Sequence, residues 1–193
     1  MEREACGSRA VARADYNEND AERGGKEDAV LSQDSQSPRM RLLFVCSGNI
    51  CRSPLAEAIF ASLVRAEGLE DRFELDSAGT GDWHEGERAD PRARRVGEGH
   101  GAPVTSIART IHDSDFDRFD LILAMDRGHQ RQLLRRCPPA HQAKIRLMRE
   151  YDDPGSAPDV PDPYYGALDG FERVYAMLSV CCRNLLRTLL AGG

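Results

Sequence analysis

The sequence predicts an α/β fold, a single domain with a four-stranded parallel sheet flanked by helices on both faces. From residue 41 onward, short apolar runs alternate with longer stretches in which apolar residues recur at helical spacing. This alternation is typical of parallel sheets, because consecutive parallel strands are joined by helical crossovers. The run Phe119–Met125 is almost continuously apolar, as expected of a strand that helices cover on both faces.

The first predicted elements are a strand and a helix joined by a tight turn. Arg41–Val45 is predicted as a strand because its residues are apolar after the first. Ser53–Glu67 is predicted as a helix, since its apolar residues fall on one face and Gly68 can end it. Ser53 and Pro54 are residue types favoured at the N-cap and in the first turn of a helix.

The later elements repeat this order of strand and helix. A glycine-rich loop at residues 77–90 follows the second strand, and a polar, proline-rich loop at residues 151–166 precedes the last helix. Pro138 and Pro139 end the helix before them. The predicted strands are Phe73–Asp76, Phe119–Met125 and Ile145–Met148, and the predicted helices are Pro91–Glu98, Arg127–Arg136 and Leu168–Leu190.

Composition limits the classes of protein to consider. The 26 basic and 32 acidic residues give a net charge of −6, which argues against nucleic acid or an anionic membrane as partner. Residues 1–39 are rich in charged and small polar residues, and we expect a disordered N-terminal extension before a domain at 40–193. There is no signal-peptide pattern and no apolar stretch near the roughly 20 residues that span a bilayer, so we expect a cytoplasmic protein.

The turn after the first strand contains the most informative motif. Cys46 and Arg52 are separated by five residues, and such a turn can direct backbone N–H groups and a guanidinium at one phosphate above a sulfur. Gly48 permits unusual backbone angles, and Asn49 tolerates left-handed ones. We therefore predict a phosphate-binding loop at the C-terminal end of the first strand, where α/β folds bind ligands.

A second cysteine–arginine pair shows that this spacing alone is weak support for a phosphate-binding loop. Cys181 and Arg187 are also separated by five residues, but they lie within an apolar pattern of helical period without a glycine. A continuous helix spreads its N–H groups along its axis and cannot surround an anion. We interpret this second pair as structural.

The predicted loop suggests a cysteine nucleophile. Cysteine attacks as the thiolate, which a helix N-terminus and a nearby cation favour. A phosphocysteine mechanism also needs a general acid for the leaving oxygen. Four aspartates of the 151–166 loop are candidates, and prolines on both sides would hold one of them stiffly. The candidates are Asp152, Asp153, Asp159 and Asp162, the last of which lies between Pro161 and Pro163.

These motifs together resemble those of the low-molecular-weight protein tyrosine phosphatases. The segment from Val45 to Pro54 is similar to the signature loop of that family, and Asp162-Pro163-Tyr164 to its general-acid motif before the last helix. The segments 76–93 and 119–126 are similar to two further family segments. The resemblance covers residues 40 to 191 and leaves the N-terminal extension outside.

The resemblance implies roles for individual residues. Cys46 is the expected nucleophile, Arg52 binds phosphate, and Asp162 is the acid and then the base for water. Ser53 would hydrogen-bond the Cys46 sulfur, and Asn49 would brace the loop. Trp83 and Tyr164 would line a slot for an aromatic ring. The substrate and phosphate would be bound by Ser47, Gly48, Asn49, Ile50, Cys51, Ser53, Trp83 and Tyr164.

Cys51 and two departures from the family pattern add further expectations. The resemblance implies a reversible disulfide between Cys51 and Cys46, which would make the enzyme redox-sensitive; the alternative is that Cys51 only packs. Ser106 stands where many relatives have a histidine, and His129 replaces a common asparagine three residues after Asp126. Two outcomes are open: Asp126 and His129 together restore the polar support of the loop, or the loop is less rigid.

Three rival functions use the same residues differently. Protein-arginine phosphatases share the scaffold but carry threonine at the position of Ile50, so the apolar side chain favours phosphotyrosine. An arsenate reductase needs a downstream pair of redox cysteines, and residues 52–136 contain none. A binding module without catalysis would not need both Cys46 and Asp162.

The sequence therefore predicts hydrolysis of phosphotyrosine in proteins through a cysteinyl-phosphate intermediate. The expected partner is a tyrosine-phosphorylated protein, with a kinase among the candidates, and the expected state is a monomer. The six cysteines form no CxxC pair and no zinc-finger pattern, so no metal and no cofactor are expected.

Overall fold

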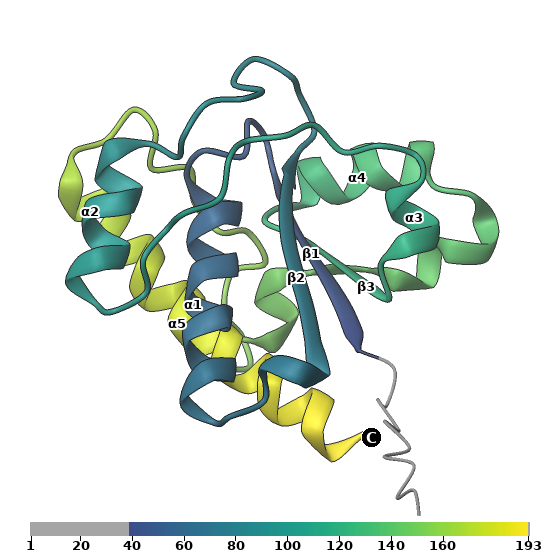
Figure 1. Ribbon diagram of the computed structural model, residues 1–193. Helices are drawn as coiled ribbons and strands as arrows, with labels where there is room; N and C mark the ends of the chain where they lie inside the picture. The colour runs from purple at the N-terminus through teal and green to yellow at the C-terminus, as the bar shows by residue number, and fades with distance from the viewer. Residues whose placement is uncertain (1–38, 193) are drawn as a thin grey trace, which may run out of the picture. The chain divides into compact units, whose positions relative to one another are not determined.

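Four parallel strands form one sheet in the order β2-β1-β3-β4 (Figure 1). The strands of this computed structural model are β1 (Met40–Cys46), β2 (Phe73–Gly79), β3 (Leu121–Ala124) and β4 (Ile145–Leu147). The structure describes residues 39–192, so the predicted N-terminal extension lies outside the described residues except for its last residue. The predicted four-stranded parallel sheet is confirmed.

Five α-helices connect or follow these strands. They are α1 (Arg52–Ala66), α2 (Pro91–Gly99), α3 (Asp115–Arg118), α4 (Arg127–Arg136) and α5 (Leu168–Ala191). Three short 3₁₀ segments add η1 (Glu70–Arg72), η2 (Pro139–Lys144) and η3 (Met148–Tyr151). The sequence pattern did not predict α3, because four residues are too few to show a helical period.

Alternate residues of β1 face two separate cores, one on each side of the sheet. Leu42 and Phe44 pack among buried residues of α1, α2 and α5, whereas Leu43 and Val45 pack among those of α3 and α4. Figure 1 shows the same division, with α1, α2 and α5 on one side of the strands and α3 and α4 on the other. Because β1 is covered on both faces, its residues from Leu42 to Val45 are fully buried.

Helix α5 has the length and composition of a membrane span, with a mean hydropathy of 1.3 over its apolar window. One face of this helix nevertheless belongs to the core on the α1 side of the sheet, with Phe171, Val174 and Leu178 buried there. The core helix of a globular domain can have the same length and hydropathy as a membrane span, so these two properties alone do not identify α5 as one. The predicted pair Cys181 and Arg187 lies within α5, as expected.

The register brings the carboxyl ends of three strands together. Cys46 at the end of β1 pairs with Gly79 of β2, and Val45 pairs with Ala124 of β3. The segments that leave these strands therefore start side by side at one edge of the sheet. This edge is where open α/β sheets place their ligand sites.

Candidate active site

The turn between β1 and α1 places Cys46 under the start of a helix. The Cys46 side chain is buried, and its Sγ lies 3.1 Å from the Ser53 hydroxyl oxygen. Helix α1 begins at Arg52 with Cys51 as N-cap, so the prediction that Ser53 caps the helix is wrong. The Ser53 hydroxyl lies inside the first turn, where it contacts the sulfur instead.

Asn49 gives the turn its shape. It is the only non-glycine residue of 39–192 with a positive φ, 57°. Its Nδ2 donates to the hydroxyls of Ser53 (2.9 Å) and Ser77 (2.8 Å), and its Oδ1 accepts from the backbone N–H of Arg109 (3.0 Å). These bonds tie the turn to β2 and to the 109–111 segment, which fits the predicted bracing role.

Gly48 matters for space rather than for backbone angle. Its φ lies outside the left-handed region, so the prediction that Gly48 is needed for an unusual backbone angle is wrong. A Cβ at this position would lie 2.8 Å from the ring carbon Cδ2 of His84. The glycine therefore lets the His84 ring approach the loop.

Arg52 is buried, with 3% of its surface exposed, and its guanidinium is fixed by several acceptors. Nη1 donates to Asp126 Oδ2 (2.9 Å) and to the Val160 carbonyl (3.1 Å). Nη2 donates to Asp162 Oδ2 (2.7 Å) and to Ser47 Oγ (3.2 Å). Nε is buried without a partner in the described part of the chain, which leaves one donor for a ligand.

Asp162 is the aspartate of the 151–166 loop that lines the same hollow as Cys46. Its carboxylate contacts Arg52 and also accepts the Tyr164 backbone N–H at 3.0 Å. The side chain is 45% exposed, so solvent reaches it. Asp159, another sequence candidate, pairs with Arg127 at 2.9 Å instead. The geometry thus singles out Asp162 among the four candidates.

The end of this loop is held by an arginine that the sequence analysis did not single out. Arg92 Nη1 donates to the Gly166 carbonyl at 2.7 Å, and Nη2 donates to the Tyr164 carbonyl at 2.9 Å. The same guanidinium pairs with Asp90, the N-cap of α2. Burial would raise the pKa of Asp90, but its hydrogen bonds with Arg92 outweigh that and lower it.

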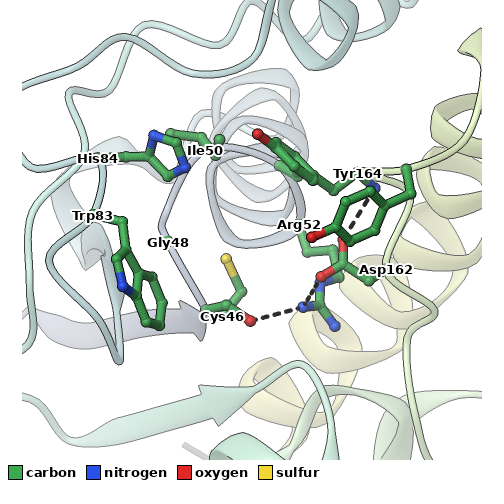
Figure 2. A pocket seen from close by; sticks show the side chains of 11 residues that line it. Cys46, Gly48, Ile50, Arg52, Trp83, His84, Asp162 and Tyr164 are labelled. Atoms are coloured by element: carbon green, nitrogen blue, oxygen red, sulfur yellow. Dashed lines mark hydrogen bonds and ion pairs between the residues drawn. The ribbon is translucent and has the colours of Figure 1, made fainter.

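A hollow of about 360 Å³ opens above the Cys46 sulfur. Figure 2 shows Trp83 and His84 on one side of it and Asp162 and Tyr164 on the other. Trp83 is 70% exposed, so it forms a wall of the hollow and is not a core residue. The lining residues are Cys46, Ser47, Gly48, Ile50, Cys51, Arg52, Trp83, His84, Asp162, Tyr164 and Tyr165.

The hollow brings together most of the predicted site residues. Asn49 and Ser53 are the exceptions, since both are buried behind the loop and act on its shape or on the sulfur. Tyr165, 96% exposed, is a lining residue to which the resemblance gave no separate role. Its position beside Tyr164 in the sequence was the only available signal.

A half-buried acid, Asp126, supports Arg52 from behind. Burial would raise the pKa of Asp126, but the adjacent His129, through its ring and its backbone N–H, and the charge of Arg52 outweigh burial and hold it well below its usual range. Asp126 is the N-cap of α4 and accepts the backbone N–H of His129 at 2.8 Å. It therefore stays ionised as a counter-charge for the arginine.

Cys51 lies in the loop as a free, buried thiol, as does Cys46. Burial, with smaller contributions from Asp90 and other charges, raises the pKa of the Cys51 thiol. The proposed pairing of these two cysteines stays a prediction. Within residues 39–192, no group of three His, Cys, Asp or Glu side chains could hold a metal ion.

Comparison with known proteins identifies the family. A model of the low molecular weight phosphotyrosine protein phosphatases matches residues 41–192. The chain belongs to this family. A low molecular weight protein-tyrosine-phosphatase of Streptomyces coelicolor is 50% identical over 149 residues, which are 76% of this chain and 91% of the relative. The resemblance read from the sequence motifs is thereby confirmed, as is the assignment to the protein-tyrosine phosphatase enzymes.

Solved structures of the phosphatase family agree in fold. A protein tyrosine phosphatase from Entamoeba histolytica superposes with a TM-score of 0.77 and 46% identity, covering 79% of this chain and 98% of that one. An arginine phosphatase, YwlE, superposes with a TM-score of 0.71 and 29% identity, covering 78% and 95%. The scaffold is therefore similar to phosphatases of two substrate classes, and the choice between them depends on the site.

Proposed function

We propose that this phosphatase hydrolyses phosphotyrosine in proteins through a cysteinyl-phosphate intermediate. The observation that carries the proposal is one hollow that contains the Cys46 sulfur, Arg52 and Asp162, with Trp83 and Tyr164 as aromatic walls. Each chemical group that the two steps need lies on this hollow or directly behind it.

In the first step the Cys46 thiolate attacks phosphorus, and the bond from phosphorus to the tyrosine oxygen breaks. Arg52 and the backbone N–H groups of the loop stabilise the charge on the equatorial oxygens during transfer. Asp162 donates a proton to the leaving phenolate oxygen. The phosphoryl group is then bonded to sulfur, and the aryl alcohol departs.

In the second step water hydrolyses the cysteinyl phosphate. Asp162, now a carboxylate, accepts a proton from the attacking water, and the phosphorus–sulfur bond breaks. The electron pair returns to sulfur, where the Ser53 hydroxyl at 3.1 Å can donate a hydrogen bond to the thiolate. Phosphate leaves, and the thiolate is regenerated.

The alternative substrate is phosphoarginine, which the likeness to an arginine phosphatase favours. Ile50 is the distinguishing residue, since it lines the hollow with an apolar side chain next to the aromatic walls. An apolar wall suits a phenyl ring better than a charged guanidinium, because an unpaired charge loses hydration there.

Matched peptides that differ only in phosphotyrosine or phosphoarginine test the choice. We expect kcat/KM to be higher for phosphotyrosine by at least about a hundredfold, a transition-state difference of about 2.7 kcal/mol. In Ile50→Thr we expect this ratio to shrink. A wild-type preference for phosphoarginine would contradict the proposed substrate class.

The partner is a tyrosine-phosphorylated protein, and we propose that a kinase is among the candidates. We further propose a monomer that works in the cytoplasm. Support for the compartment comes from the five cysteines among the described residues, all of which are free thiols. Size-exclusion chromatography with light scattering tests the monomer, and fractionation of the source cells tests the compartment.

A further inference from the structure

Four side chains form a closed ring behind the phosphate loop. Arg52 Nη2 donates to Ser47 Oγ at 3.2 Å, and Ser47 Oγ lies 2.9 Å from His129 Nε2. His129 Nδ1 lies 3.0 Å from Asp126 Oδ2, which also accepts from Arg52 Nη1 at 2.9 Å. The ring therefore starts and ends on the arginine that faces the ligand hollow.

Donor and acceptor rules allow one consistent direction around the ring, in which Ser47 donates to His129. Arg52 can only donate, so Ser47 Oγ is the acceptor in the contact between these two residues. The single hydroxyl proton of Ser47 is then free to point at His129 Nε2, and in this arrangement Nε2 accepts. In a neutral imidazole the other nitrogen, Nδ1, carries the proton and faces Asp126.

The link from His129 to Asp126 is the weakest of the four. The short Nδ1–Oδ2 distance describes a bent contact, because the N–H does not point directly at the oxygen. The backbone N–H of His129 adds a second and well-directed bond to Asp126 Oδ1 at 2.8 Å. His129 thus contacts both carboxylate oxygens, one through a hydrogen bond and one through the bent contact.

Because the ring is largely buried, the loss of any one contact is costly. Arg52 and His129 are 3% and 4% exposed, so neither side chain can replace a lost partner with bulk water at little cost. Without the imidazole, the Ser47 hydroxyl loses its acceptor and the Asp126 carboxylate loses a neighbour. Both groups contact the guanidinium, one at Nη2 and one at Nη1.

We propose that His129 is a positioning residue for Arg52, acting through Ser47 and Asp126 to fix the guanidinium in the plane that receives phosphate. A planar guanidinium recognises two phosphate oxygens at once, so a small rotation weakens both bonds together. The inference rests on the proposed binding of phosphate by Arg52. His129 itself does not line the ligand hollow.

Four variants and a control test this role. His129→Ala removes both contacts, whereas the side chain introduced by His129→Gln can reach the Ser47 hydroxyl from about the place of Nε2. Ser47→Ala and the double variant Ser47→Ala/His129→Ala complete a mutant cycle. The control is His100→Ala, since His100 is 46% exposed, pairs with Glu172 and lies outside the hollow.

We expect His129→Ala to raise KM for an aryl phosphate and the inhibition constant of inorganic phosphate by about tenfold, with a smaller fall in kcat. His129→Gln should recover most of this loss, and His100→Ala should leave both constants unchanged. Because Ser47 and His129 belong to one series of contacts, the double variant should have constants no higher than those of the more impaired single variant. Additive effects, or a Gln variant as weak as the Ala variant, would overturn the proposal.

Nitrogen-15 NMR of the histidine rings gives a readout that is independent of activity. We expect His129 of the wild-type protein to show a protonated Nδ1 and an unprotonated Nε2 when its ring is neutral. The opposite tautomer would overturn the ring direction even if His129→Ala failed to fold. A wild-type protein that binds no inorganic phosphate would contradict the proposed function, whereas normal binding with unchanged variants contradicts only the role of His129.

Discussion

Cys46 differs from the other described cysteines in its neighbours more than in its burial. All five are buried, and burial is the main cause that raises the pKa of the other four thiols. Cys181, which shares the spacing to an arginine, has a pKa raised to about 12 inside α5. Only Cys46 among the described cysteines has a serine hydroxyl within 3.1 Å and lies on the hollow beside Arg52.

Replacing the nucleophile tests this difference. We expect Cys46→Ser to lower kcat for an aryl phosphate by at least about a thousandfold, because a serine alcohol is not ionised at neutral pH. Cys137→Ala is a suitable control, since Cys137 is buried on the α4 side of the sheet away from the hollow. Steady-state kinetics of both variants decides, and near-normal turnover in Cys46→Ser would rule out the cysteinyl intermediate.

The acid is tested by the leaving group. We expect Asp162→Asn to slow turnover by about a hundredfold or more for poor leaving groups and much less for good ones, since good leaving groups need little protonation. Asp159→Asn is the matched control, because that aspartate lies in the same loop but pairs with Arg127. A series of aryl phosphates of graded leaving-group pKa measures the effect. Equal slopes in the wild type and Asp162→Asn would place the acid elsewhere.

At the scale of elements, the turn from β1 to α1 depends on one residue in two ways. Asn49 supplies the left-handed backbone conformation and three hydrogen bonds, two of them buried. Asn49→Ala loses both, whereas Asn49→Gly keeps the backbone conformation without strain.

These two variants separate the two contributions. We expect Asn49→Ala to lower the free energy of unfolding by about 2–4 kcal/mol and Asn49→Gly by about 1 kcal/mol less. Urea denaturation of both variants measures the difference, and kcat reports on the loop itself. Equal stability of the two variants would mean that the left-handed conformation is not costly at this position.

The sequence predicted elements better than contacts. Each predicted strand and helix has a counterpart in the structure, because each contains its own periodic signal. β2 runs to Gly79 instead of ending at Asp76, since its last residues bond across to β1 in a way that composition does not reveal. The four-residue helix α3 was missed because it is too short to show a helical period, and the Cys51 cap because no side-chain cap hydrogen bond marks it.

The site shows the same limit. Cys46 and Arg52 could be predicted because they lie in one short segment, whereas Asp162 was one of four candidates until the resemblance was used. The ring through His129 could not be predicted, since 82 residues separate it from Ser47. Only the meeting of the β1 and β3 carboxyl ends brings these two side chains together.

At the scale of the whole molecule, paired carboxylates set the response to acid. Hydrogen bonds and nearby arginine or histidine charges lower the pKa of five aspartates below their usual values. They are Asp90, Asp120, Asp126, Asp159 and Asp169. A lowered pKa in the folded state adds stability above the unfolded value, near 4, and this stability is lost as pH falls.

We therefore expect the free energy of unfolding to fall steadily as pH is lowered below about 4, because the unfolded chain then binds more protons. Asp126→Asn should weaken this dependence, since its pKa lies well below the usual range. Asp71→Asn is the control, because the Asp71 side chain is 99% exposed. Urea denaturation across the acid range measures each slope, and an unchanged slope in Asp126→Asn would contradict the expectation.

The contact between Arg52 and Asp162 affects how tightly the enzyme binds phosphate and other anions. A phosphate that binds Nη2 competes with the Asp162 carboxylate for this donor, so the measured affinity reflects competition between an internal anion and an external one. Neutralising the internal competitor in Asp162→Asn should tighten inhibition by inorganic phosphate while turnover slows. Asp162 would then both transfer the protons of the reaction and weaken the binding of the phosphate product.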